Sequence, residues 1–177
     1  MTMDISVIGM GKLGAPLAAV LASSGNKVIG LDKNKAIVDL VLEGIAPVSE
    51  AGLQDLMDSS LSNLSCTSSY EMAIAESDIS FVIVPTPSTQ EGVFTNKYVL
   101  DAVESIGREI AKKKTYHIVN ICSTVMPGSC DGEIRSALER SSGKKVGVEI
   151  GLCYNPEFIA LGSVIKNMQF PDMILVG

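Results

Sequence analysis

Short apolar runs alternate with amphipathic segments along the whole sequence, and this alternation constrains the fold more than any other feature. Six runs rich in valine and isoleucine occur at Ile5–Ile8, Val28–Leu31, Ile79–Val84, His117–Ile121, Val146–Tyr154 and Met173–Val176. Runs of this length that are apolar on both faces are typical of parallel strands covered by helices on each side. The repeated order of strand and helix predicts an α/β fold with a doubly wound, mostly parallel sheet of the Rossmann type.

The segments between these runs have the spacing of helices. Three of them carry apolar stripes, at Leu13, Leu17, Val20 and Leu21, at Ile37, Leu40, Val41 and Ile45, and at Val99, Ala102, Val103, Ile106 and Ile110. A further helix is predicted from near Gly128 to Arg140, because Pro127 is well suited to the start of a helix. The serine-rich stretch Ser59–Ser69 is expected to join a helix to a short strand.

The composition limits the class of protein. With 177 residues, of which 46% are hydrophobic and 19% charged, the chain is expected to form one domain with a large core. Its net charge of −6 argues against general binding to nucleic acid, although backbone amides could still hold a nucleotide. The N-terminus has no basic signal region, and the longest apolar stretch, Leu17–Ala22, is too short to cross a bilayer, so we expect a cytoplasmic protein.

The cysteine and histidine content argues against a metal site. Four cysteines lie far apart and there is a single histidine, so the spacings of a zinc site cannot be built. His117 lies within an apolar run and is predicted to be a packed core residue rather than a catalytic base.

A glycine-rich turn follows the first predicted strand and opens the first predicted helix. It has the pattern G-x-G-x-x-G, formed by Gly9, Met10, Gly11, Lys12, Leu13 and Gly14. In this context the pattern predicts a dinucleotide site: Gly9 permits a tight turn, Gly11 lets a pyrophosphate approach the backbone, and Gly14 allows close packing of helix on strand. Free amides at the start of the helix would face the diphosphate. The alternative is that the glycines serve packing alone.

Asp32 ends the second predicted strand, 18 residues after Gly14. A carboxylate at this place accepts hydrogen bonds from ribose hydroxyls and repels a 2′-phosphate, which predicts NAD rather than NADP as the cofactor. Lys33 and Lys35 weaken that preference, because a nearby cation could accommodate a phosphate. The alternative is that Asp32 only caps the following helix.

Three later segments follow predicted strands, at the edge where a doubly wound sheet binds its ligands. Val84–Pro87 forms a turn with two prolines, and Ser123–Gly128 brings two hydroxyls and a helix start to the same edge. Each could equally be an ordinary strand-to-helix turn. In Tyr154–Phe158, Glu157 stands where a carboxylate can position water or move a proton, unless it only complements a helix dipole.

Taken together, these segments resemble the UDP-glucose/GDP-mannose dehydrogenase family. The matching residues occur in the order of the family: Gly9–Gly14, Asp32, Pro47-x-x-Glu50-x-Gly52-Leu53, Val84–Pro87, Ser123-Thr124-Val125-x-Pro127-Gly128, Asn155–Phe158 and Pro171–Gly177. The resemblance covers essentially the whole chain, residues 1–177, and corresponds to the N-terminal NAD-binding domain of that family.

The resemblance implies oxidation of a sugar primary alcohol to a uronic acid, a polysaccharide precursor, on a nucleotide-diphospho sugar with two NAD. It implies that Thr124 helps to position water and substrate and that Glu157 serves in acid–base chemistry. Cofactor contacts are implied at Gly9, Met10, Gly11, Lys12, Leu13, Gly14, Asp32, Val84, Pro85, Thr86, Pro87, Ser88, Ser123, Thr124, Val125 and Leu161. Sugar contacts are implied at Glu157, Phe158, Ile159, Ala160 and Leu161.

Departures from the family pattern leave the sugar open among UDP-glucose, UDP-N-acetylhexosamines and GDP-mannose. Ala51 replaces a frequent proline, Leu161 a frequent charged residue, and Ile37 a basic residue near the cofactor ribose. The nucleophilic cysteine and catalytic lysine of the family lie downstream of Gly177. We therefore expect the first domain of a longer, homo-oligomeric protein, without the central helix and C-terminal domain, that binds cofactor but does not turn over substrate alone.

Two other functions remain compatible with the sequence. One is a non-catalytic module that senses the redox state of a dinucleotide. The other is the first domain of a β-hydroxyacid or 6-phosphogluconate-type dehydrogenase, which shares the glycine fingerprint but explains Asn155–Phe158 less well.

Overall fold

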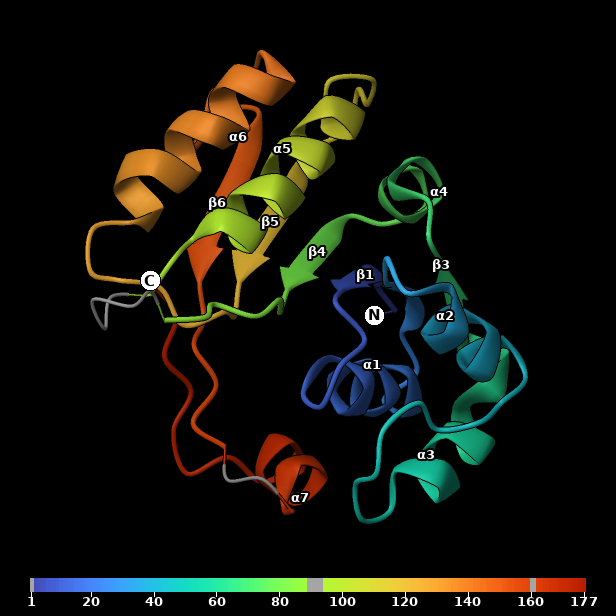
Figure 1. Ribbon diagram of the computed structural model, residues 1–177. Coiled ribbons are helices and arrows are strands. Elements are labelled where there is room, and N and C mark those ends of the chain that lie inside the picture. The colour runs from blue at the N-terminus through green and yellow to red at the C-terminus, as the bar shows by residue number, and fades with distance from the viewer. Residues whose placement is uncertain (1, 89–93, 160–161) are drawn as a thin grey trace.

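The computed structural model describes residues 2–88, 94–159 and 162–177 and contains one sheet of six parallel strands in the order β3-β2-β1-β4-β5-β6 (Figure 1). The strands are β1 Asp4–Ile8, β2 Lys27–Leu31, β3 Leu64–Thr67, β4 Ile79–Val82, β5 His117–Ile121 and β6 Ile150–Tyr154. The strand order reverses between β1 and β4, so the crevice between their carboxyl ends is the switch point of the sheet. The predicted doubly wound parallel sheet is confirmed.

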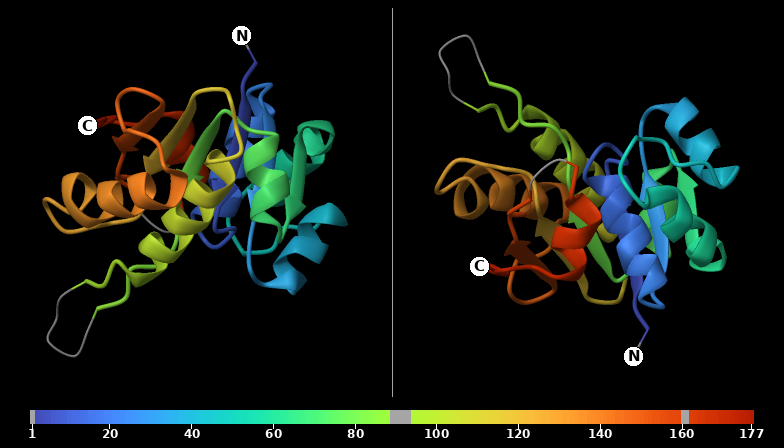
Figure 2. Two further views of the ribbon diagram at one scale, coloured as in Figure 1. Left: turned by 90° about the horizontal axis from the view of Figure 1, so that it is seen from above. Right: turned by 90° about the horizontal axis from the view of Figure 1, so that it is seen from below.

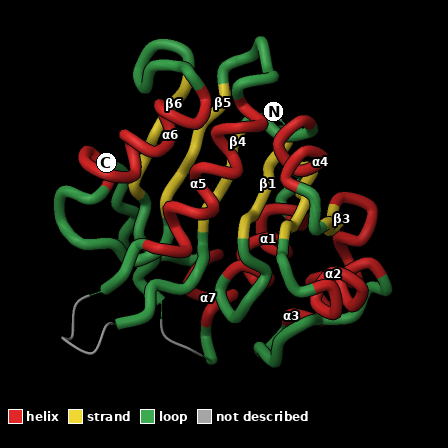
Figure 3. Tube along the Cα trace, turned by 45° about the horizontal axis from the view of Figure 1, so that its top comes forward, coloured by secondary structure: helices red, strands yellow, loops and turns green. Residues whose placement is uncertain are grey.

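Helices cover both faces of the sheet. They are α1 Gly14–Ser23, α2 Lys35–Leu42, α3 Leu53–Ser60, α4 Tyr70–Ala75, α5 Lys97–Ile110, α6 Arg135–Ser142 and α7 Val164–Gln169. One apolar cluster joins α4, α5 and α6 to the sheet, and a second joins α1, α2, α3 and α7 to the other face. Figure 2 shows α1 beside α7 in the view from below, and Figure 3 shows α5 and α6 in front of the strands. No helix among the described residues has both the length and the apolar character that crossing a membrane requires.

The predicted helical stripes differ in accuracy. In α5 all five predicted core residues are buried. In α1 the most deeply buried side chains are instead Ala15, Ala18, Ala19 and Ala22, each at most 1% exposed. Small side chains let α1 approach the sheet closely, so the larger Val20 and Leu21, predicted as core, lie at its partly buried flank.

Three predicted strands differ from the structure: one is absent and two are shorter than predicted. Residues 173–176 form no strand: their side chains are exposed, and only Gly177 exchanges backbone hydrogen bonds with Tyr154, at 2.8 and 2.9 Å. The run predicted at 146–154 is broken by a turn in which Gly147 has φ +85°, so that β6 begins at Ile150. β4 ends at Val82, because the Val84 amide donates to the Ser123 hydroxyl instead of to a strand.

The helix predicted from near Gly128 begins at Cys130, as a π-helix over Cys130–Ile134 that runs into α6. Gly128 has φ +84°, which is not helical. The chain therefore reaches this helix through a turn, and Pro127 precedes the helix rather than starting it.

His117 is completely buried, as predicted, within a chain of hydrogen bonds. Its Nε2 lies 2.8 Å from the Ser80 hydroxyl, which lies 2.7 Å from that of Ser6, and Ser77 follows at 3.0 Å from Ser6. On the other side, the Lys113 ammonium lies 3.3 Å from Nδ1. A protonated imidazole would place a second cation beside the Lys113 ammonium, so this contact favours the neutral imidazole.

This network predicts a pH dependence of stability. Burial, with Lys113 and Lys144 nearby, lowers the pKa of His117 from 6.5 to about 4. Between pH 6.5 and about pH 4, His117 is protonated in the unfolded chain but neutral in the folded chain. From this group alone, the free energy of unfolding should therefore fall by about 2 kcal/mol between pH 7 and pH 5. Urea denaturation of wild type and His117→Gln at both pH values measures the difference. Equal losses in the two proteins would contradict the assignment.

Candidate functional site

The turn between β1 and α1 explains two of the three fingerprint glycines. Gly9 has φ +100°, and its amide donates to the Leu31 carbonyl at 2.7 Å. A Cβ on Gly14 would lie 1.7 Å from the carbonyl oxygen of Gly9, so α1 packs directly on the turn. Both positions therefore need glycine because of the chain's own atoms.

Gly11 is different, because a Cβ there would meet no atom within 4 Å. The backbone amides of Gly11, Lys12 and Leu13 have no acceptor among the residues that the structure describes, and Leu13 gives α1 no capping side chain. The turn thus presents unpartnered donors beside open space at the start of a ten-residue helix. A diphosphate fits this arrangement, because its oxygens accept hydrogen bonds and the helix dipole favours negative charge.

Asp32 connects the end of β2 to the fingerprint turn. Its Oδ2 accepts from the Met10 amide at 2.9 Å, and its Oδ1 accepts from the Asn34 amide at 2.8 Å. The cap of α2 is Asn34, whose side chain accepts from the Ala36 amide at 3.1 Å. Asp32 therefore does not cap α2, and its carboxylate lies at the switch point of the sheet.

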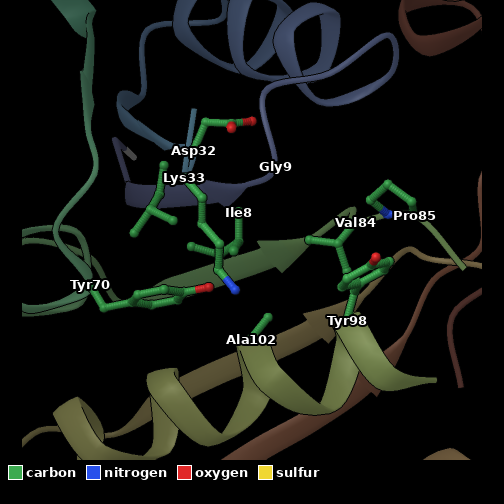
Figure 4. Close-up of a pocket in the computed structure, with 10 residues that line it drawn as sticks. Ile8, Gly9, Asp32, Lys33, Tyr70, Val84, Pro85, Tyr98 and Ala102 are labelled. Atoms are coloured by element: carbon green, nitrogen blue, oxygen red, sulfur yellow. The ribbon is translucent and has the colours of Figure 1, made fainter. Parts of the chain in front are cut away.

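Two cavities meet at the carboxyl edge of the sheet. The first, here called the fingerprint cleft, has a volume of about 470 Å³ and is lined by Gly9, Gly11, Lys12, Leu13, Asp32, Ile83, Val84, Pro85, Thr86, Cys122, Ser123, Thr124 and Glu157. The second, here called the tyrosine pocket, has about 150 Å³ and is lined by Ile8, Gly9, Leu31, Asp32, Lys33, Tyr70, Val84, Pro85, Tyr98 and Ala102 (Figure 4). They share Gly9, Asp32, Val84 and Pro85 as lining residues, so they lie next to each other, and together they are here called the groove.

Some predicted contact residues point into the fold instead. The Met10 side chain is buried, and a Cβ on Gly30 would lie 2.6 Å from its sulfur. The Ser123 hydroxyl accepts from the Val84 amide at 2.9 Å and lies 2.8 Å from the Val84 carbonyl oxygen, so it ties β5 to the turn after β4. Val125 belongs to the core. Of these three, Ser123 lines the cleft, but its hydroxyl is engaged within the fold.

Other predicted residues lie beside the groove. Thr124 is exposed and lines the fingerprint cleft together with Thr86. Among the described residues, neither cavity is lined by Gly14, Pro87, Ser88, Phe158 or Ile159. The predicted contacts at Ala160 and Leu161 lie outside the described residues.

The tyrosine pocket contains residues that the sequence did not reveal. Tyr70 begins α4, and Tyr98 and Ala102 lie one turn apart on α5. In Figure 4, Tyr70 and Tyr98 come from opposite ends of the pocket, and the Lys33 side chain extends toward Tyr70. Burial, with the carboxylates of Asp101 and Asp32 nearby, raises the pKa of Tyr70 to about 12, so its hydroxyl stays a neutral hydrogen-bond donor. The only sign of this pocket in the sequence was Tyr98, an aromatic residue outside the apolar stripe of the helix that became α5.

Two titratable groups line the cleft side by side. Burial raises the pKa of the Glu157 carboxyl, so this group holds its proton to a higher pH than an ordinary glutamate. Burial also raises the pKa of the Cys122 thiol, with smaller contributions from Glu157 and Cys153. A protonated thiol is a poor nucleophile, so Cys122 is not suited to covalent catalysis, whereas Glu157 is suited to moving a proton.

The sequence profile of the UDP-glucose/GDP-mannose dehydrogenase family, NAD binding domain, matches residues 3–177. The chain belongs to this family. Membership confirms the predicted resemblance and NAD as the cofactor of the domain, and it decides against the β-hydroxyacid and 6-phosphogluconate-type dehydrogenases.

Relatives within the family are similar over nearly the whole chain. GDP-mannose 6-dehydrogenase of Pseudomonas aeruginosa is 37% identical, covering 99% of this chain but 41% of that protein. A crystal structure of a ternary complex of GDP-mannose dehydrogenase from the same species superposes with a TM-score of 0.96, again over 99% of this chain and 41% of that one. UDP-glucose dehydrogenase of the archaeon Pyrobaculum islandicum is 34% identical with a TM-score of 0.94, over 100% and 41%. The chain thus spans about two fifths of the length of these relatives.

Proposed function

We propose that this chain is the NAD-binding domain of a nucleotide-sugar 6-dehydrogenase that oxidises a sugar primary alcohol to a uronate with two NAD. The observation that carries the proposal is the groove at the switch point, which joins unpartnered amides, the Asp32 carboxylate and Glu157. A module that only senses a dinucleotide needs no acid–base group beside its cofactor, whereas Glu157 places a carboxyl in the lining of the cleft, so its position favours the enzyme. The relatives act on different sugars by name, so GDP-mannose and UDP-glucose are both candidate substrates.

The groove divides into regions of different chemistry. The tyrosine pocket offers apolar and aromatic walls suited to the adenine ring, and Asp32 at its border would accept from the ribose hydroxyls. The amides of Gly11, Lys12 and Leu13 would hold the diphosphate. This leaves the end of the cleft near Thr86 and Thr124 for the nicotinamide.

The reacting end of the cleft holds the two proposed catalytic residues. When bound, NAD⁺ supplies the hydride acceptor. Thr124 is exposed and would position water and substrate by hydrogen bonds, and Glu157 would exchange a proton with them. Phe158 and Ile159 continue from Glu157 toward the proposed sugar contacts at Ala160 and Leu161.

Calorimetric titration with NADH and, separately, NADPH tests the cofactor site. We expect wild type to bind NADH at least about tenfold more tightly than NADPH, because the Asp32 carboxylate repels a 2′-phosphate. Asp32→Ala should weaken NADH binding by about tenfold, which corresponds to the loss of one hydrogen bond to a charged group. It should also reduce the ratio between the affinities for NADH and NADPH. Asp39→Ala, which removes an exposed carboxylate on α2 outside the groove, is the matched control. Equal affinity of wild type for both nucleotides, or binding of neither, would contradict the proposal.

A further inference from the structure

A hydrogen bond across the molecule connects the loop before α3 to the start of α7. The Oε1 atom of Glu50 accepts from the backbone amide of Val164 at 2.8 Å, although the two residues are 114 positions apart. Glu50 is partly buried, and the Val164 side chain is completely buried. The bond satisfies an amide at the start of α7 that would otherwise have no partner within the helix.

The loop that carries Glu50 is itself fixed by α3. The Gln54 side chain accepts from the Ala46 amide at 2.9 Å and donates to the Gly44 carbonyl at 2.7 Å. The Leu53 amide donates to the Glu50 carbonyl at 3.2 Å. These bonds connect the loop and the backbone of Glu50 to α3. The position of the Glu50 carboxylate is therefore set by α3.

On the opposite side, α7 packs into the cluster that contains α1 and α3. Ile165 and Met168 belong to the same apolar cluster as Leu53 and Met57, and Figures 1 and 2 show α7 close to α1. α7 has only six residues, so packing and the bond from Glu50, rather than intrinsic helix stability, must hold it.

Hydrogen bonds anchor the described residues at both ends of the segment between β6 and α7, of which residues 160–161 lie outside the described ones. At its beginning, the Asn155 amide donates to the Ile121 carbonyl at 2.9 Å, and the Asn155 side chain donates to the Leu175 carbonyl at 2.9 Å. At its end stands the bond from Glu50 to Val164. Glu157 lies between these anchors, two residues after Asn155 and seven before Val164, and lines the fingerprint cleft.

We propose that Glu50 is a positioning residue, which holds Glu157 in the cleft by fixing the start of α7. The proposal rests on the proposed function for the role of Glu157 and adds a residue outside the cleft to it. Among the residues that line the two cavities of the groove, Glu50 is absent, so it does not act on the reaction directly. It acts through α7, because Met168 of α7 and Glu157 line one cavity together.

Two variants and one control test the proposal in this chain. Glu50→Ala removes the acceptor, Glu50→Gln keeps an oxygen of the same reach, and Glu43→Ala removes an exposed glutamate after α2. In Glu50→Ala, hydrogen exchange of the Val164 amide should be at least about tenfold faster, and a carboxyl titration followed by NMR should show the pKa of Glu157 moving back toward the ordinary value. Glu50→Gln and Glu43→Ala should match wild type, and NADH affinity should stay within about twofold in all three.

The same variants in the longer enzyme test the consequence for turnover. In Glu50→Ala, kcat for the nucleotide sugar should fall about tenfold while KM for NAD is unchanged, because a small displacement of a reacting group lowers the rate without removing cofactor binding. Glu50→Gln should restore kcat. If Glu50→Ala does not fold, Glu50→Asp, whose carboxylate is one methylene shorter, should give the same losses.

The outcomes separate this proposal from the proposed function. Faster exchange at Val164 with an unchanged titration of Glu157 and an unchanged kcat would overturn the proposal, because Glu50 would then only cap α7. Absence of NADH binding or turnover in wild type would overturn the proposed function, and the titration of Glu157 would still decide whether Glu50 positions it.

Discussion

Gly14→Ala should destabilise the fold by about 3 kcal/mol, whereas Gly11→Ala should leave the free energy of unfolding within about 0.5 kcal/mol of wild type and weaken NADH binding by about 100-fold. The two glycines lie three positions apart in one turn, but the structure requires glycine at each position for a different reason. A methyl group on Gly14 would lie 1.7 Å from the carbonyl oxygen of Gly9, which is backbone and cannot move aside without shifting α1. The destabilisation therefore arises from overpacking inside the protein.

Gly11 has no such neighbour. A methyl group there meets nothing within 4 Å and would instead occupy the space beside the unpartnered amides of Lys12 and Leu13. A diphosphate kept from those amides loses at least one charge-assisted hydrogen bond, each worth about 1.5–3 kcal/mol, and meets the methyl group as well.

Urea denaturation and calorimetric titration with NADH, performed on both variants, measure the two effects separately. Gly132→Ala is the control for replacing a glycine outside the groove, because a Cβ there also meets nothing within 4 Å and, as at Gly11, φ is not positive. Wild-type NADH affinity in Gly11→Ala would place the diphosphate elsewhere. Wild-type stability in Gly14→Ala would show that the turn adapts.

The fold was predictable where burial on both faces leaves a simple pattern. β1 and β5 each have three isoleucine or valine residues out of five, and they were predicted with an error of at most one residue at an end. Residues 173–176 are also apolar, but they form no strand. The prediction failed there because an apolar run does not reveal whether a neighbouring strand is present to pair with it. The buried face of α1 was misjudged because alanine contributes little to a hydrophobic stripe, yet its small size permits the closest packing.

The geometry of the candidate site was predictable where its residues are close in the sequence. The fingerprint and Asp32 follow from their positions at the ends of two adjacent strands. The tyrosine pocket was not predictable, because Tyr70 and Tyr98 come to line one pocket only after α4 and α5 have packed on the same face of the sheet. Ser123 has the sequence context of a helix cap, and only the structure shows that its hydroxyl ties two strand ends together.

In the proposed full-length dehydrogenase, Glu157→Gln should lower kcat by about 100-fold or more, the usual contribution of a positioned acid–base group. Burial raises the pKa of this carboxyl above its ordinary value of 4.5. If the carboxylate acts as a base, activity must fall as the pH decreases through that raised pKa, and this acidic limb should disappear in the glutamine variant. Steady-state NADH formation with GDP-mannose and with UDP-glucose, measured between pH 5 and pH 9, gives both results.

Glu157→Gln should change proton transfer without changing cofactor binding or stability. Glutamine has nearly the shape of glutamate, so NADH binding and the free energy of unfolding should remain close to wild type, and Glu149→Gln, at an exposed position before β6, should retain full activity. The 177-residue chain alone should bind NADH but form none from either sugar. Sustained NADH formation by this chain would show that Glu157 and its surroundings suffice for the chemistry. An unchanged kcat in Glu157→Gln would instead move the proton-transfer role to another group, and would leave the raised pKa of Glu157 as a consequence of burial alone.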